Sequence, residues 1–336
     1  GGGGMGVVYR ARQISLDREV ALKIFAYDPF AIEDMLARFR SEARHAGRLQ
    51  HPNIVPVFEI GTHENLHYFS MGLVRGPTLG RYLKQAPRTH QELARLMRTI
   101  AEAVEYAHQV GILHLDLKPG NVMIDERGAA QVADFGLAHR ISEAAEGRVL
   151  AAGSPAYMAP EQATRAARLT VQTDIWGLGA ILFEMLTGTP PYKGKDTPDT
   201  MRLRRAQPPD PPRLRDPSIP ADLDAICRHC LAQDPAQRYA SARELADDLQ
   251  RFLDGRPVSV REPSSGERVH LWMRRDPRTA ALTGVLAITL LGGLAISLGL
   301  WRQAEGLRVD AQSTLYEARR QSALEAQSRG DPLLAL

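Results

Sequence analysis

The stretch "ILHLDLKPGNVMI", residues 112–124, carries the densest group of chemically active side chains in the sequence. Asp116, Lys118 and Asn121 fall within six residues, and the proline between them favours a loop over a helix. The tripeptide "DFG", which begins at Asp134, follows 13 residues after Asn121. Two aspartates and an asparagine are hard oxygen ligands of the kind that Mg²⁺ requires, and Mg²⁺ commonly accompanies phosphates. The pattern therefore predicts a metal and phosphate site, against the alternative of an ordinary acidic turn at Asp134.

The first ten residues, "GGGGMGVVYR", point to the same chemistry. Gly1, Gly3 and Gly6 fit the pattern G-x-G-x-x-G, and a flexible linker is the alternative because glycine runs are frequent. Lys23 follows 17 residues after Gly6, in "VALK", on a segment that alternates like a strand. A lysine at the end of a strand under a glycine loop can reach phosphate oxygens. Lys23 therefore favours a phosphate-binding loop.

The pattern of apolar residues divides the chain into a small β-rich part and a larger helical part. Residues 7–25 alternate and favour β-branched types, which predicts a hairpin, and residues 51–61 and 66–74 predict two further strands. Residues 32–50 have apolar positions at helical spacing among many charges, which predicts an exposed amphipathic helix. Residues 91–111 predict a long helix. The expected fold class is α+β.

With "SPAYMAPE" at residues 154–161 and "DIWGLG" at residues 174–179, this ordered series resembles a eukaryotic-like (Hanks-type) serine/threonine protein kinase of the membrane-anchored bacterial kind. The resemblance extends from residue 1 to about residue 253. It implies the bilobal protein-kinase fold and transfer of the γ-phosphoryl group of ATP to serine and threonine hydroxyls of proteins, its own included. It also implies ATP and Mg²⁺, with Mn²⁺ as an acceptable substitute.

The resemblance assigns a role to each matching residue. Asp116 would accept the proton of the substrate hydroxyl, and Lys118 would steady the transferring phosphoryl group and mark serine/threonine specificity. Asn121 and Asp134 would hold the metal ion. The expected ATP-binding residues are those of the glycine loop, the adenine pocket, the phosphate-binding lysine with its glutamate partner, and the hinge: Gly1, Gly3, Gly6, Val8, Ala21, Lys23, Glu42, Met71, Leu73 and Met123.

The resemblance also implies contacts that support the site. Glu161 would pair with a buried Arg238, and Asp174 would brace the catalytic loop. His114 invites a general-acid role, but we expect it to pack against the "DFG" segment. Ser154 would contact Asp116 and Lys118.

Two residues depart from the family pattern. Leu115 stands where relatives have an arginine that pairs with a phosphorylated activation loop, and leucine cannot bind a phosphate. Residues 136–160 contain no threonine, and Ser142 is the one serine there besides Ser154. We therefore expect the site to order without activation-loop phosphorylation. Gly72 stands where relatives often have a hinge glutamate, and backbone contacts to adenine survive that change.

The alternative function is that of a pseudokinase, a nucleotide-binding signalling scaffold without phosphoryl transfer. Against it, Lys23, Glu42, Asp116, Asn121 and Asp134 are all present. A metal site at Cys227 and Cys230, which have C-x-x-C spacing, is a weaker alternative because no second pair completes it. With two cysteines in the chain, a disulfide framework is excluded. The net charge of +3 is too small to indicate nucleic acid as a partner.

We expect four segments. Residues 1–254 form the kinase domain, which begins inside the glycine motif and so lacks its first strand. Residues 255–278 are polar, with prolines, glycines and serines, and predict a juxtamembrane linker. Residues 279–301 carry no charge and, at about 35 Å as a helix, are long enough to cross a membrane. Residues 302–336 predict the truncated start of an extracytoplasmic helical region.

The arginines around the apolar segment predict its orientation. Arg268, Arg274, Arg275 and Arg278 precede the segment, whereas Arg302 and Arg308 follow it closely. The positive-inside rule then places the kinase domain in the cytoplasm, with a single pass through the cell (inner or plasma) membrane. Small residues spaced four apart inside the span, together with the outer region, suggest self-association as a dimer.

Overall fold

The structure, a computed structural model, describes residues 2–3, 6–24, 49–63, 66–135, 139–140, 154–163, 168–261 and 277–328. Gly1, Glu42, Ser142 and nearly all of the predicted helix over residues 32–50 lie outside the described residues. The chain forms two units, Gly1–Glu262 and Pro263–Leu336.

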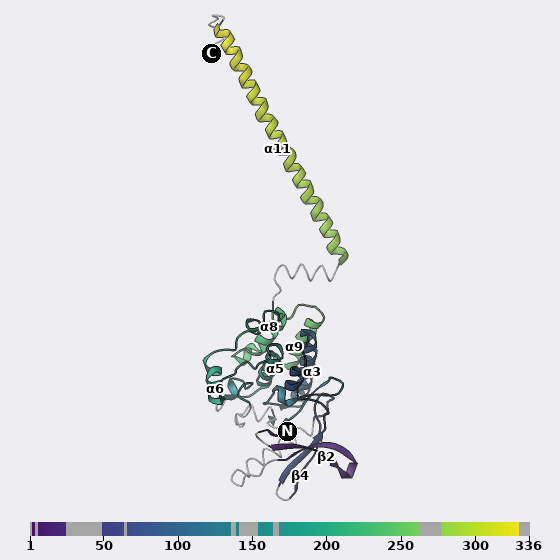
Figure 1. The fold of residues 1–336 in the computed structure, drawn as a ribbon. Helices are drawn as coiled ribbons and strands as arrows, with labels where there is room; N and C mark the ends of the chain where they lie inside the picture. The colour runs from purple at the N-terminus through teal and green to yellow at the C-terminus, as the bar shows by residue number, and fades with distance from the viewer. Residues whose placement is uncertain are drawn as a thin grey trace. The chain divides into compact units, whose positions relative to one another are not determined.

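The first unit begins with a five-stranded antiparallel sheet in the order β1-β2-β3-β5-β4 (Figure 1). The hairpin of β2 and β3 and the two later strands confirm the strands predicted from the sequence. Asp17 closes the hairpin turn in the left-handed conformation, with φ of +47°. The elements of this lobe are β1 Gly2–Gly3, β2 Gly6–Gln13, the 3₁₀ turn η1 Ile14–Leu16, β3 Arg18–Ile24, β4 Val57–His63 and β5 Leu66–Gly72.

The rest of the first unit is a larger, mainly helical lobe (Figure 1). Its helices are α2 Leu79–Gln85, α3 His90–Gln109, α5 Val171–Thr187, α6 Thr197–Ala206, α7 Pro212–Arg215, α8 Ala221–Cys230 and α9 Ala242–Leu253. Its short strands are β6 Ile112–Leu113, β7 Val122–Ile124, β8 Ala130–Val132 and β9 His139–Arg140, and its 3₁₀ turns are η2 Pro119–Asn121, η3 Glu161–Ala163 and η4 Pro235–Gln237.

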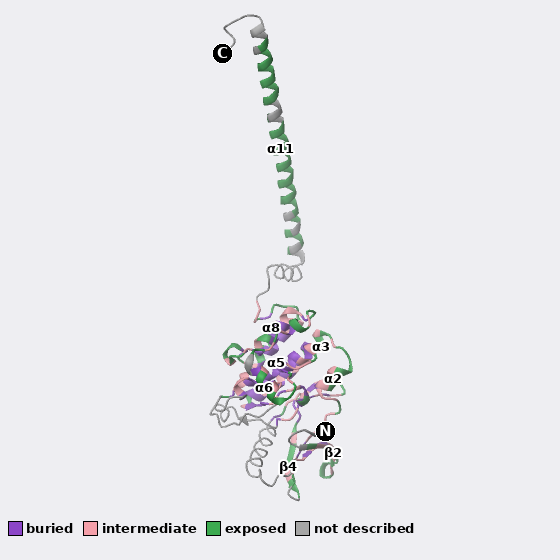
Figure 2. Ribbon diagram, turned by 60° about the vertical axis from the view of Figure 1, so that its left-hand side comes forward, coloured by how far each residue is buried: buried purple, intermediate pink, exposed green. Residues whose placement is uncertain are grey.

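Two helices explain where the core of this lobe lies. Helix α3, the predicted long helix, begins with a capping box in which the Thr89 hydroxyl accepts from the backbone N–H of Glu92, and the Glu92 carboxylate accepts from the N–H of Thr89. Helix α5 is buried around its circumference, as Figure 2 shows, and contains the large buried side chains of Trp176 and Phe183. A helix that is apolar on all sides belongs in a core. Helices α3, α7 and α8 pack directly against α5, and α9 packs in turn against α3 and α8.

The chain passes from the sheet to the helical lobe at Gly76. A Cβ atom at this position would lie 1.9 Å from the carbonyl oxygen of Ile124, so no other residue fits without moving β7. Backbone hydrogen bonding from Ile124 to the Pro77 carbonyl, at 2.9 Å, fixes the crossing. The connection between the lobes is thereby held against β7, next to the catalytic loop.

The first unit extends past α9 into the segment that the sequence assigns to a linker. Val258 is buried, and Ser259 donates its backbone N–H and its hydroxyl to the Asp248 carboxylate at 2.8 and 2.7 Å. Burial raises the pKa of Asp248, but hydrogen bonds from Ser259, Arg251 and Tyr239 outweigh this effect and hold the pKa below its ordinary value. Residues 256–261 therefore pack against the helical lobe and are hydrogen-bonded to it.

The second unit is described by one helix, α11 Pro277–Ser328. Within the described residues, its segment Ala281–Gly306 is the one stretch whose length and composition would suffice to cross a membrane. This segment has 26 residues and a mean hydropathy of 2.1, and none of its most apolar window is buried in the structure. The helix continues without a break through the residues that the sequence expects after the span.

Candidate active site

One face of the sheet gathers apolar side chains around a lysine. Val8 lies directly opposite Lys23 in the β2–β3 pair, and Ala21 and Lys23 lie opposite Met71 and Phe69 in the β3–β5 pair. Opposite residues of antiparallel strands share a face. The expected adenine-binding residues Val8, Ala21 and Met71 therefore lie on the same face as the expected phosphate-binding Lys23. That lysine is 7% exposed.

The glycine motif is partly described. Gly3 of β1 pairs directly with Gly6 of β2, so the two glycines lie side by side at the edge of the sheet. Gly1 lies outside the described residues.

The hinge lies between β5 and the helical lobe. Gly72 donates its N–H to the Pro56 carbonyl at 2.9 Å, and a Cβ on Gly72 would lie 3.0 Å from the ring of Pro56. This tight contact favours glycine at position 72. Leu73, which was also predicted to belong to the hinge, is the residue after Gly72. Met123, on β7, forms a backbone bridge with Thr78, which places it close to the connection between the lobes.

Lys23 connects the sheet to the helical lobe. Its ammonium group forms an ion pair with the carboxylate of Asp134, which directly precedes Phe135. Asp134 has a φ of +59°, a left-handed conformation that non-glycine residues adopt mainly where the surroundings impose it. The expected partner Glu42 lies outside the described residues. The structure thus brings together two of the predicted site residues that are 111 positions apart.

The catalytic loop forms a network around the Asp116 carboxylate. Its Oδ2 atom accepts from the Lys118 ammonium at 2.6 Å and from the Asn121 side-chain amide at 3.1 Å. Its Oδ1 atom accepts from the backbone N–H of Ser154 at 3.1 Å, and Lys118 also donates to the Ser154 hydroxyl at 2.9 Å. The predicted contacts of Ser154 are confirmed. Asp116, Lys118 and Asn121 therefore form one cluster together with the start of the segment 154–163.

Asp174 braces this loop from α5, as predicted. Its carboxylate is 1% exposed and accepts from the backbone N–H groups of His114 and Leu115, both at 2.8 Å, and from the His108 ring at 2.8 Å. Burial raises the pKa of Asp174, but the hydrogen bond and charge of His108 and the proximity of His114 hold the pKa below its ordinary value. The brace therefore stays ionised.

His114 packs, as predicted, against the segment that contains Asp134. Its Nε2 atom lies 3.2 Å from the Ala133 carbonyl, and its ring lies 4.6 Å from the ring of Phe135. The backbone of Asn121 accepts from the Ala133 N–H at 2.8 Å. The catalytic loop and Asp134 are therefore held next to each other.

The side-chain oxygen atoms of Asn121 and Asp134 are of the type that binds a divalent cation. Its amide nitrogen donates to the Asp116 carbonyl at 2.8 Å as well as to the carboxylate, which directs the amide oxygen away from Asp116. That oxygen and the Asp134 carboxylate are hard ligands, and Mg²⁺ sites at phosphates commonly use one or two protein ligands and complete the shell with water and phosphate oxygens. Asn121 and Asp134 therefore have the ligand chemistry that such a site uses.

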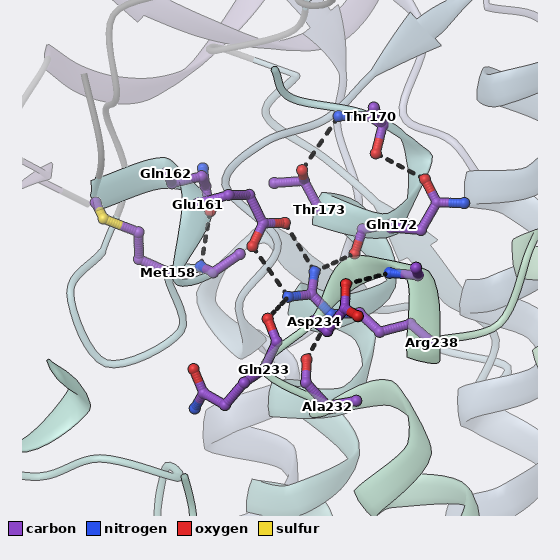
Figure 3. Close-up of polar contacts among 12 residues, drawn as sticks. Met158, Glu161, Gln162, Thr170, Gln172, Thr173, Ala232, Gln233, Asp234 and Arg238 are labelled. Carbon is purple, nitrogen blue, oxygen red and sulfur yellow. Dashed lines mark hydrogen bonds and ion pairs between the residues drawn. The ribbon is translucent and has the colours of Figure 1, made fainter. Parts of the chain in front are cut away.

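The segment after Ser154 is anchored by a buried ion pair (Figure 3). The Arg238 guanidinium, with a side-chain exposure of 0%, donates to both carboxylate oxygens of Glu161 at 2.7 and 3.0 Å. It also donates to the backbone carbonyls of Gln172 and Ala232, both at 2.8 Å. The predicted pair is confirmed.

Two buried polar residues next to the loop escaped the sequence analysis. Gln162 donates to the Leu115 carbonyl at 2.8 Å and accepts from the Ala159 N–H at 2.9 Å. His108 contacts Asp174. The burial of His108 could have been predicted from the sequence, because His108 lies four residues after Val104 and so on the apolar face of α3. Gln162 has no such local signal, because its partners lie elsewhere in the chain.

The two cysteines form no metal site in the part of the chain that the structure describes. Cys227 and Cys230 are buried in α8, and burial raises the pKa of both thiols. His229 packs instead against the ring of Tyr239 at 4.6 Å. Among the described residues there is no group of three or more His, Cys, Asp or Glu side chains that could hold a metal ion.

Comparison with known proteins places this geometry in a family. The model of the protein kinase domain matches residues 1–249. Serine/threonine-protein kinase PrkC of Bacillus subtilis is 39% identical over 259 residues, which cover 76% of this chain and 39% of that protein. Serine/threonine-protein kinases PknB of Mycobacterium leprae and Mycobacterium tuberculosis are 37% and 36% identical, over 76% of this chain and 42% of each relative. The match thus spans about two fifths of these curated relatives. The chain belongs to the protein kinase domain family, whose members use ATP, a divalent cation and a protein substrate.

Proposed function

We propose that the chain transfers the γ-phosphoryl group of ATP to serine and threonine hydroxyls of proteins, its own included, with Mg²⁺ as the metal. The observation that carries the proposal is the cluster of Asp116, Lys118 and Asn121, held beside the Lys23–Asp134 ion pair. Each type of group that phosphoryl transfer requires is present there: a base, cations and metal ligands.

The proposed roles follow from the contacts. Asp116, anchored at both carboxylate oxygens, would accept the proton of the substrate hydroxyl. Lys118 bridges Asp116 and Ser154 and can balance negative charge at the oxygen that attacks. Lys23 would exchange its contact with Asp134 for the α- and β-phosphates. A divalent cation bound at Asn121 and Asp134 would neutralise phosphate charge. Val8, Ala21, Met71, Leu73 and Met123 would surround the adenine.

The direct test is transfer of label from γ-labelled ATP to the chain itself and to a generic basic protein. We expect label on serine and threonine with Mg²⁺, and a loss of ~100-fold or more when EDTA removes the cation. ATP binding is measured separately by equilibrium dialysis. ATP binding without any transfer would contradict the proposal and would support the pseudokinase alternative.

We also propose that Ala281–Gly306 of α11 crosses a membrane. Its 26 residues are more than the roughly 20 that a hydrocarbon core requires, and its large apolar side chains are exposed in the structure. Under this proposal the chain is a single-pass membrane protein of the cell membrane, the linker runs from the end of the packed residues 256–261 to residue 278, and the residues after the span begin an extracytoplasmic region.

A pair of charged substitutions tests the span. Leu290→Arg combined with Leu294→Arg is expected to move the protein from the carbonate-resistant membrane pellet to the extractable fraction, because each arginine near the middle of a span costs ~2.5–3.5 kcal/mol. Leu315→Arg, on the same helix but beyond the apolar segment, is the matched control and should stay in the pellet. Recovery of the unmodified chain in the soluble fraction without detergent would contradict the proposal.

The orientation and the oligomeric state remain part of the proposal. The excess of arginines before the span favours a cytoplasmic kinase domain. This orientation can be tested in sealed membrane vesicles of known sidedness, by measuring whether an added protease cleaves the kinase domain. Self-association through the span and the region after it would bring two kinase domains together, and cross-linking in membranes measures it.

A further inference from the structure

The residue directly before Asp116 has an unusual backbone conformation. Leu115 has a φ of +63°, in the left-handed region that β-carbon-bearing residues rarely occupy. Such a conformation costs on the order of 1–3 kcal/mol and persists only where surrounding contacts impose it. Because the Leu115–Asp116 peptide sets the direction of the Asp116 side chain, whatever holds Leu115 also holds the proposed base.

Three sets of contacts hold Leu115. Its side chain is 5% exposed and packs with Leu113, Leu169 and the half-buried Val171. Its N–H donates to Asp174 at 2.8 Å. Its carbonyl accepts from the side chain of Gln162 at 2.8 Å. Both polar groups of the Leu115 backbone are therefore fixed, one by α5 and the other by the turn η3.

Gln162 is suited to this position by its chemistry. One end of its amide faces a carbonyl, which can only accept, and the other faces the Ala159 N–H, which can only donate. A neutral carboxamide with its nitrogen toward Leu115 is the one orientation that satisfies both. The residue is 4% exposed, so neither bond is readily replaced by water.

The same side chain ties two parts of the site together. Ala159 belongs to the segment 154–163, whose carbonyls at Met158 and Ala159 also accept from the buried Arg204 of α6. Ser154 joins this segment to Asp116 at one side of the catalytic loop, and Gln162 joins it to Leu115 at the other. A displacement of the catalytic loop or of segment 154–163 would strain both the contact of Ser154 with Asp116 and the contact of Gln162 with Leu115.

We propose that Gln162 is a positioning residue that holds the catalytic loop in its left-handed conformation and keeps it in register with segment 154–163. The order of the loop then comes from contacts inside the helical lobe. The inference rests on the proposed kinase function for its kinetic consequences but not for its structural ones.

Gln162→Glu and Gln162→Met test the proposal in the full chain. Glutamate has the same shape but places a carboxylate against the Leu115 carbonyl, and methionine removes both hydrogen bonds. We expect kcat for phosphoryl transfer to fall ~10–100-fold in both variants, the size of effect that a misplaced catalytic group produces, with KM for ATP unchanged. Gln207→Glu makes the same chemical change at an exposed residue and should leave kcat unchanged.

The pH dependence separates positioning from a loss of folded protein. In the Gln162→Glu variant, the introduced carboxyl group can donate to the Leu115 carbonyl as the amide does, but only when it is protonated. We expect burial and the nearby carboxylates of Asp116, Asp174 and Glu161 to raise the pKa of this carboxyl group by more than the guanidinium groups of Arg204 and Arg238 lower it. We expect the kcat ratio of Gln162→Glu to wild type to rise as the pH falls from 8 to 6. The ratio for Gln162→Met should stay constant.

Hydrogen exchange gives a readout that does not depend on activity. The amide of Leu115 should exchange at least ~10-fold faster in Gln162→Met than in wild type, and at the wild-type rate in Gln207→Glu. Wild-type protection at Leu115 in the methionine variant would overturn the proposal, as would equal, pH-independent losses of kcat that match the fraction of unfolded protein. If the wild-type chain transfers no phosphoryl group, the proposed function fails while the exchange result still decides the role of Gln162.

Discussion

Asp116→Asn is expected to lower kcat for phosphoryl transfer by ~10²–10⁴-fold, the contribution that a positioned general base makes in other enzymes. An asparagine cannot take up the proton of the substrate hydroxyl. Its amide nitrogen would also face either the Lys118 ammonium or the Ser154 N–H, each of which needs an acceptor. The loss should therefore appear in kcat, measured with labelled ATP and a protein substrate.

ATP binding should survive this substitution. The groups proposed to bind the nucleotide, Lys23 and the apolar face of the sheet, do not depend on the Asp116 carboxylate, so KM for ATP should change less than about threefold. Asp17→Asn is the matched control, because Asp17 lies in an exposed hairpin turn and asparagine tolerates its left-handed backbone. Retention of more than a tenth of kcat in Asp116→Asn would remove Asp116 from the proposed mechanism.

The elements that the sequence predicted correctly are those with a local pattern. The β2–β3 hairpin follows from alternation, and α3 confirms the long helix predicted over residues 91–111. The family resemblance added contacts between distant residues, such as Glu161 with Arg238 and Asp174 with the catalytic loop. Those contacts could be predicted because the motifs that carry them occur in a fixed order along the chain.

The elements that the sequence analysis missed depend on distant partners. Gln162 acts on Leu115, 47 positions away, and nothing in the residues around it distinguishes this glutamine from an exposed one. The left-handed backbone of Leu115 runs against the preference of leucine, so it is imposed by tertiary contacts, whereas aspartate tolerates the same conformation at Asp134. Polar composition also predicted a linker from residue 255, because the role of Ser259 as a donor to the buried Asp248 is visible only once α9 is folded.

These cases share a physical cause. Buried polar groups must find partners, and the cost of leaving one unpaired is comparable to the whole effect of a typical mutation. Composition and periodicity show which side chains are apolar enough to be buried. They do not show which polar side chain will form a hydrogen bond with a strained peptide group such as that of Leu115. The contacts that position a site are therefore the least visible part of it in a sequence.

The buried pair of Glu161 and Arg238 should have the largest effect on stability. Glu161→Gln keeps the shape and one acceptor oxygen, but it removes the negative charge that balances the fully buried Arg238 guanidinium and turns its second acceptor into a donor. Removing one partner of a buried pair typically costs ~3–5 kcal/mol. For a unit of this size that corresponds to a fall of roughly 6–20 °C in the unfolding midpoint, measured by calorimetry on the full chain in detergent.

A double-mutant cycle separates the pair from its surroundings. Arg238→Met should destabilise by a similar amount, because it strands the Glu161 carboxylate and the carbonyls of Gln172 and Ala232. Adding Glu161→Gln to Arg238→Met should cost little more than Arg238→Met alone, because the stranded charge is gone. Arg202→Gln, which breaks the exposed pair with Asp199, should leave the midpoint unchanged. Additive losses in the double variant would show that Glu161 and Arg238 contribute to stability separately.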